Sequence, residues 1–326
     1  MRMMSRFVGI FFTTLVFSAS QLALAQSYPS RTVKMVVAFA PGGGHDVIAR
    51  LLAKYLGPRL GQSVIVENKP GANGMIGAEY VARAAPDGLT ILFASPAELV
   101  IAPTTYKTMR YDPMKDLAPV TLAGTTPLVL VANPSLGVKT LPELIALAKR
   151  EPGKLSFATP GNGSSQHLAG GWLNNLAGID LQHIPFNGAA PATNAVLGGQ
   201  VPLAIVGMAP VLPHIRAGQL VAIAVTTAKR VVWAKDVPTV AETPGMEGFE
   251  VTHWMGVLVP ARTPPAIIQR LQSEFAAVLA MPEVRERLAT IGVDPVGSTS
   301  AEFHDYMIAE QARFARMFKF TGLTPE

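Results

Sequence analysis

The sequence contains no cysteine among its 326 residues. Disulfide bonds and thiolate metal ligands are therefore excluded, and we expect no lipid-modified cysteine. Histidine is also sparse, with six residues, and no two of them have the spacing of a helical zinc motif. We therefore predict neither a metal ion nor a cofactor.

Charged residues are also scarce, at 15% of the chain, with a formal net charge of +5. No basic run is interleaved with aromatic residues, so we predict no nucleic-acid binding. Beyond the N-terminal region, no apolar stretch approaches the roughly 20 residues that a membrane-spanning helix needs. The composition therefore favours a globular protein with a small ligand.

The first 25 residues have the features of a secretory signal peptide. Arg2 and Arg6 precede an apolar stretch over 7–17, and the small residues of 23–25 suit a cleavage site. An uncleaved anchor is the alternative, but hydroxyl residues interrupt the apolar stretch. We predict cleavage before Gln26 and a mature protein in the periplasm.

Strand-like and helix-like segments alternate along the rest of the chain. The order over 33–94 is β-α-β-α-β, which is typical of a doubly wound parallel sheet, and a second series covers 155–225. Helical patterns fill most of 264–318. The β-rich segment 120–131 contains Pro127, and we interpret it as a crossing between two lobes. The sequence therefore predicts an α/β fold in which the first lobe is interrupted by the second and the C-terminal helices pack on the first.

Helix starts can also be predicted from single residues. Thr140 precedes the helical pattern of 141–150, and Glu143 follows three residues later. This spacing predicts a capping box.

Loops that follow strands are the candidate binding sites, because ligands of open α/β sheets bind beyond the C-terminal strand ends. The first such loop comprises Ala40, Pro41, Gly42, Gly43, Gly44, His45 and Asp46. Its glycines permit close approach of the backbone, and the next helix start favours an anion. The pattern is neither a P-loop nor a dinucleotide fingerprint. Capping of the helix is the alternative role of Asp46.

The second loop offers hydroxyl groups before a helix. Its candidate residues are Thr159, Gly161, Gly163, Ser164 and Ser165. Capping and anion binding explain the serines. A serine nucleophile is the alternative, because His167 is close in sequence, but the nucleophile-elbow pattern is absent.

The third and fourth loops contain Asn187 and Ala190, and Gly207 and Met208. We expect Met208 to pack on the carbon chain of a ligand. None of the four loops contains lysine or arginine, so backbone N–H groups would hold a carboxylate.

Three residues near these loops have open roles. His45 could donate a hydrogen bond to the ligand. Glu98 follows a strand end and could face the site, although we favour a solvated acid at a helix start. We interpret His253, beside a tryptophan, as structural.

Several segments carry a family resemblance. The most specific are VVAFAPGGGHDVIARLLA (36–53), VIVENKPGANGMIGAEYVARAAPDG (64–88) and LGGQV (197–201). Further matching segments are 106–124, 161–170, 183–201, 212–230 and 236–243. In this order they resemble the extracytoplasmic solute receptors of tripartite tricarboxylate transporters, of the Bug or TctC type.

The resemblance implies a type II-like periplasmic-binding-protein fold, often called a Venus flytrap. It implies one lobe of residues 26–126 plus 251–326 and a second lobe of residues 127–250. It also implies that backbone amides and water hold a carboxylate in the cleft, with Ser95 and Ala97 as further candidates. His45 and Asn187 depart from the Thr, Pro or Ser and the Lys that the family often has, so we carry over no named ligand.

We therefore predict a non-catalytic, monomeric periplasmic receptor. It would capture a small organic acid, namely a dicarboxylate, a tricarboxylate, an acidic amino acid or an aromatic acid, and deliver it to membrane permease subunits. A sensory component for a signalling partner and a periplasmic serine hydrolase are the alternatives.

Overall fold

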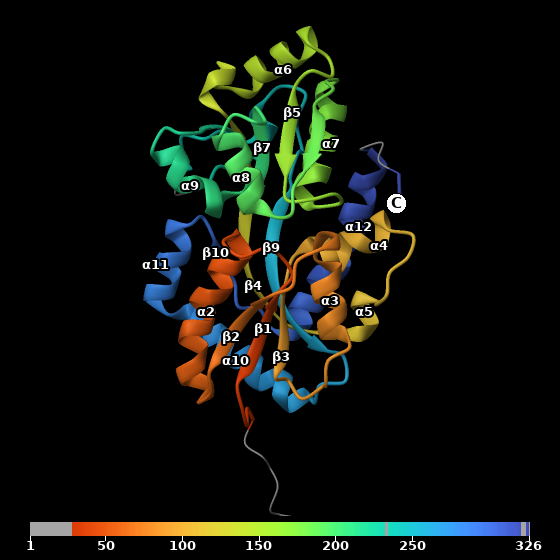
Figure 1. Cartoon of the computed structure of the whole chain (residues 1–326), viewed down its shortest axis with the longest axis vertical. Coiled ribbons are helices and arrows are strands. Elements are labelled where there is room, and N and C mark those ends of the chain that lie inside the picture. Colours follow the sequence, from red (N-terminus) through yellow and green to blue (C-terminus); the bar gives the residue numbers. More distant parts are fainter. Residues whose placement is uncertain (1–27, 232–233, 321–323, 326) are drawn as a thin grey trace, which may run out of the picture.

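The computed structural model describes residues 28–231, 234–320 and 324–325. The predicted signal peptide lies outside these residues. Figure 1 shows two lobes stacked along the long axis, with helices on both sides of the strands. Among the described residues, no helix is both long and apolar enough to cross a membrane.

The first lobe is built around five longer strands. Its strands, in sheet order, are β2 (Val64–Asn68), β1 (Val33–Val37), β3 (Thr90–Ala94), β9 (Thr252–Pro260) and β4 (Leu117–Ala132), and the short β10 (Asp294–Pro295) pairs with β4. The β2, β1 and β3 strands are parallel, as predicted, and β9 runs antiparallel to β3. The helices of this lobe are α2 (Gly44–Leu60), α3 (Met75–Ala82), α4 (Ala102–Thr105), α5 (Pro113–Asp116), α10 (Pro265–Ala280), α11 (Pro282–Thr290) and α12 (Ser300–Phe320).

The second lobe repeats the α/β alternation. Its strands are β7 (Leu203–Gly207), β5 (Ser156–Thr159), β6 (Gln182–Pro185) and β8 (Val221–Val225). The strands β7 and β8 pair with the end of β4, and β5 lies between β7 and β6. Its helices are α6 (Leu141–Arg150), α7 (Ser165–Ala177), α8 (Ala189–Leu197) and α9 (Met208–Arg216). The predicted capping box at Thr140 and Glu143 is confirmed, with both reciprocal hydrogen bonds present.

Short helical turns complete the chain. They are η1 (Ala72–Gly74), the π-helical η2 (Ala97–Ile101), η3 (Pro134–Leu136) and η5 (Val240–Glu242). The sequence patterns did not predict η2, which follows β3 directly.

The strand β4 joins the two lobes. Residues 117–127 pair with β9, whereas residues 128–132 pair with β7 and β8. The predicted crossing over 120–131 is therefore confirmed, and Pro127 occupies the last position that pairs with β9. We keep the lobe boundaries near residues 126 and 250 as a proposal, and this change of partner supports the first of them.

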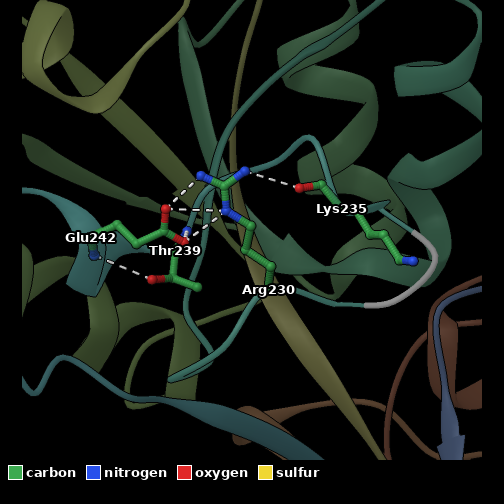
Figure 2. A network of polar contacts seen from close by, with 4 residues as sticks. All are labelled: Arg230, Lys235, Thr239 and Glu242. Carbon is green, nitrogen blue, oxygen red and sulfur yellow. Dashed lines mark hydrogen bonds and ion pairs between the residues drawn. The ribbon is translucent and has the colours of Figure 1, made fainter.

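An ion pair orders the segment that returns from β8 to β9 (Figure 2). The Arg230 guanidinium donates to both carboxylate oxygens of Glu242 and, through Nη1, to the carbonyl oxygen of Lys235 at 3.0 Å. Thr239 Oγ1 accepts a hydrogen bond from Glu242 N at 3.2 Å, which caps η5. Since both charged side chains are about half exposed, solvent screens the pair, and we assign it to the shape of this segment rather than to overall stability.

The helix α12 packs on the crossing strands from the first-lobe side. The fully buried Trp254 of β9 donates its indole N–H to Glu310 of α12 at 3.0 Å. Phe303 of α12 meets the same indole edge to face, with ring centroids 5.6 Å apart. Gly256 leaves room for that ring, because a Cβ there would lie 2.1 Å from Phe303 Cζ.

We therefore predict that Gly256→Ala destabilises the fold. The added methyl group must displace a fully buried ring, and such overpacking costs about 1–3 kcal/mol. Denaturant unfolding would measure the loss, and the double variant Gly256→Ala with Phe303→Leu should recover part of it. Full stability of the single variant would show that α12 does not press on β9 in this way.

Candidate functional site

A cavity lies between the two lobes, where β1, β5 and β7 end and the next helices begin. The first lobe contributes Phe39, Gly43, Gly44, His45, Ser95 and Ala97 to its wall, and the second lobe contributes Pro160, Ser164, Gln166, Ala189 and Gly207. Lysine, arginine, aspartate and glutamate are absent from the described residues that line it.

Helix starts dominate this wall. The N-cap residues of α2, α8 and α9 are Gly43, Gly188 and Gly207, and none of these three helices has a side-chain cap. Their first N–H groups therefore lack an oxygen partner from a capping side chain. N–H groups and the positive ends of helix dipoles together favour an anion.

The first loop is held from behind by Asp46. The helix α2 begins at Gly44, so Asp46 is its third residue and not its cap. The carboxylate accepts hydrogen bonds from Gly42 N, Arg50 Nε and Asn68 Nδ2, each at 3.0 Å. Burial alone would raise the pKa of Asp46, but these donors hold it below its ordinary value. Asp46 thus fixes the loop and does not line the cavity.

The second loop places no base beside its serine. Ser164 Oγ donates to the carbonyl oxygen of Gly161 at 2.7 Å and accepts from His167 N at 3.2 Å, which caps α7. No imidazole nitrogen of the described residues hydrogen-bonds Ser164 Oγ. The geometry of a serine nucleophile is therefore absent at Ser164.

Two stacked histidines support the second loop. The rings of His167 and His183 lie 3.6 Å apart between centroids and are nearly parallel, at 13°. Gly163 N donates to His167 Nδ1 at 3.2 Å, and Thr159 Oγ1 lies 2.6 Å from His183 Nε2. Burial lowers the pKa of His167 to about 4, and burial together with His167 lowers the pKa of His183 to about 3. Both rings are neutral at pH 7, which the stack and the Gly163 hydrogen bond require.

A second pair of histidines lines the cavity itself. The rings of His45 and His253 meet edge to face, 5.0 Å apart between centroids. His45 Nε2 is buried and has no hydrogen-bond partner among the described residues, while His253 Nδ1 lies 3.0 Å from Ser165 Oγ. Burial lowers the pKa of His45 to about 4 and that of His253 well below its ordinary value. The interpretation of His253 as structural was therefore incomplete, because its side chain also forms cavity wall.

The expectation of a solvated Glu98 is wrong. Its side chain is fully buried, because the π-helical turn η2 folds it back onto the end of β3. The carboxylate accepts hydrogen bonds from Ser95 N at 2.7 Å and from Ser95 Oγ at 2.5 Å. Burial raises the pKa of Glu98 to about 7 in spite of these donors. Glu98 lies behind Ser95 and does not line the cavity.

The structure brings half of the predicted residues to the cavity region. Gly43, Gly44, His45, Ser95, Ala97, Ser164 and Gly207 line the cavity, and Gly161 and Asn187 line an adjoining one. The wall of neither cavity includes Ala40, Pro41, Gly42, Asp46, Thr159, Gly163, Ser165, Ala190 or Met208. Met208 in particular lies fully buried in the core of the second lobe, because the first residue of α9 turns inward.

Sequence reasoning missed Phe39, Asn73 and His253 as wall residues. Asn73 lies in a glycine-rich turn, which is a signal that could have been used. Phe39 and His253 carry no such signal, since their positions depend on how the strands meet. Within the described ranges, no group of three or more histidine or acidic side chains is arranged to hold a metal ion.

Comparisons with known proteins place this geometry in a family. The model of the tripartite tricarboxylate transporter family receptor, TctC, matches residues 48–323. The solved periplasmic binding protein BugD is 36% identical, with a TM-score of 0.87, over 92% of this chain and all of BugD.

Two other solved structures contain an acid. An R. palustris protein with adipate is 33% identical, with a TM-score of 0.88, and the match covers 92% of this chain and 100% of that one. MatC from Rhodopseudomonas palustris with malate is 32% identical, with a TM-score of 0.84, over 89% of this chain and 99% of MatC. These matches confirm the predicted two-lobed fold. The chain belongs to the tripartite tricarboxylate transporter receptors of the Bug or TctC type, which are periplasmic solute-binding proteins and not enzymes.

Proposed function

We propose that the protein captures a small organic acid between its lobes and delivers it to the permease subunits of a tripartite tricarboxylate-type transporter. The observation that carries this proposal is the meeting of helix starts from both lobes at one cavity without side-chain caps. Gly43, Gly44 and Gly207 would donate backbone N–H groups to a carboxylate. His45, Ser95 and Ser164 would add side-chain contacts.

Enclosure strengthens such a site. A Cβ on Gly44 of α2 would lie 3.6 Å from Ala209 Cβ of α9, so the two helix starts approach each other closely across the cavity. Hydrogen bonds from amides to an ionised carboxylate strengthen when water is excluded. A ligand that touches both lobes therefore stabilises the closed form over an open one, which makes closure depend on the ligand.

The chemical class follows from the wall, but the individual acid does not. The solved relatives contain adipate and malate, which differ in length and in hydroxyl content. For this chain we propose a dicarboxylate, a tricarboxylate, an acidic amino acid or an aromatic acid, bound by a monomer that a cleaved signal peptide has directed to the periplasm.

The first test is a thermal-shift panel of such acids on ligand-stripped protein, followed by calorimetry with Gly43→Val. An acid at a hundred times its dissociation constant should add about 2.7 kcal/mol of stability. Gly43 has φ −74° and ψ 167°, and its Cβ would meet only Ala40 O, at 3.5 Å, so the backbone accepts a side chain here, and we expect the methyl groups of valine to occupy the proposed anion site. We expect the variant to lose at least about tenfold in affinity, as one lost charged hydrogen bond implies.

The melting temperature of the variant without acid is the control, and it should match that of the wild type. Absence of any shift with every acid would refute the proposed function. Normal binding by Gly43→Val would refute the role of the first loop alone.

The stacked histidines generate a prediction about pH. Their folded pKa values lie below the ordinary 6.5, so the unfolded chain binds protons that the folded chain does not as the pH falls from 6.5 towards 4. The contribution of these two histidines to stability without ligand should therefore decline across this window, whereas Glu98, whose pKa is raised to about 7, contributes in the opposite sense. For His167 alone, the loss between pH 7 and pH 5 is about 1–2 kcal/mol.

His167→Asn isolates this effect, because the Asn amide oxygen can still accept from Gly163 N but cannot titrate. Denaturant unfolding at pH 7 and pH 5, in buffers without carboxylates, should show a shallower decline for the variant. An equal change in the free energy of unfolding between pH 7 and pH 5 for the variant and the wild type would mean that the fold does not hold His167 neutral.

A further inference from the structure

A strained turn carries Asn73 into the cleft. Four successive residues have positive φ angles: 128° at Gly71, 45° at Ala72, 50° at Asn73 and 91° at Gly74. Two of the four are not glycine, although this region disfavours side chains. Strain of this kind is retained where a particular placement matters for function.

The Asn73 amide has no hydrogen-bond partner in the described part of the chain, although both its oxygen and its nitrogen are buried. It reaches from the first lobe into the second-lobe loop. A Cβ on Gly161 would lie 3.4 Å from Asn73 Oδ1, and a Cβ on Gly163 would lie 3.6 Å from Asn73 Nδ2. Two glycines therefore make room for an amide that nothing in the described chain satisfies, and a buried unpaired amide needs an explanation.

A second cavity begins at this amide. It shares Phe39, Asn73 and Pro160 with the first cavity and is the roomier of the two, at about 300 Å³ against about 50 Å³. Its wall includes Gly188, the N-cap of α8, and Asn187. The described residues that line it include no charged side chain.

We propose that the two cavities form one elongated site and that Asn73 contacts the far end of the ligand. This proposal rests on the proposed function and specifies its substrate class, namely linear acids longer than four carbons with a carboxylate at each end. One carboxylate binds at the starts of α2 and α9. The carbon chain of the ligand passes Phe39, and the second carboxylate accepts a hydrogen bond from Asn73 Nδ2 in the cavity that Asn187 and Gly188 also line.

Conformational preference alone does not explain Asn73. Asparagine tolerates positive φ better than most residues. The exposed Ala72 beside it also has a positive φ, although its side chain has no polar atom, so the turn does not by itself require asparagine. The preference accounts for the turn, not for a buried amide at the junction of two cavities.

This pair of neighbours supplies matched variants. Asn73→Gly removes the amide and relaxes the backbone, whereas Ala72→Gly relaxes the backbone in the same way and removes from the wall of the second cavity only an exposed methyl group, which cannot form a hydrogen bond. Asn73→Asp keeps the shape and places a negative charge at the far end. Calorimetry with succinate, glutarate and adipate would compare all four proteins.

We expect the wild type and Ala72→Gly to bind adipate at least about tenfold more tightly than succinate. Asn73→Gly should lose about tenfold in affinity for adipate and less than about threefold for succinate, and Asn73→Asp should weaken adipate further. Melting temperatures without acid should show that all variants are folded.

Equal binding of succinate and adipate by the wild type would overturn the proposal, and so would unchanged adipate binding by folded Asn73→Gly. In those cases an acid still binds, so the proposed function stands. If no acid of the wider panel binds the wild type, the proposed function itself fails, and this inference fails with it.

Discussion

Helix starts without side-chain caps are the constraint on which this site depends. The helices α2, α8 and α9 all begin after glycine and lack a side-chain cap, and their starts lie at the cleft between the lobes. Side-chain caps are not confined to one part of the fold: Thr140 caps α6 away from the cavity and Ser164 caps α7 in the cavity wall, whereas α10 and α11 are uncapped and begin away from the cavity. Uncapped helix starts bind water or a ligand, and an anion is favoured there because it also interacts with the positive ends of the helix dipoles. Glycine at these N-cap positions therefore supplies no competing side-chain acceptor, and the proposed carboxylate would accept hydrogen bonds from the helix starts instead.

Ionisable carboxyl groups are kept one layer behind this wall. Asp46 fixes the first loop from the rear, and Glu98 lies behind Ser95. A carboxylate at the wall would repel an anionic ligand, and the raised pKa of Glu98, about 7, further reduces its charge. The neutral pair His167 and His183 likewise supports a loop without adding charge. The site thus combines a rigid polar support with a nearly uncharged surface.

How far the sequence predicts this molecule depends on the range of the interaction. Local rules predicted the bounds of α6 and its capping box, because Thr140 and Glu143 interact within one turn. They also predicted which loops lie at the cleft. They failed for Glu98 and Met208, whose burial depends on a π-helical turn and on the direction in which α9 leaves its strand. Local patterns carry no information about such packing, nor about the approach of His253 to His45.

The class of ligand and the identity of the ligand depend on different parts of the site. Backbone amides are alike in every sequence, so a wall of helix starts selects an anion and little more. Discrimination between acids must then come from the few side chains at the wall that can vary, above all His45, Asn73 and Asn187. His45 and Asn187 are positions where this chain departs from the family pattern it resembles, and Asn73 lies in a strained backbone turn. A receptor built in this way can change its ligand through substitutions at these positions while the helix starts that bind the carboxylate stay the same.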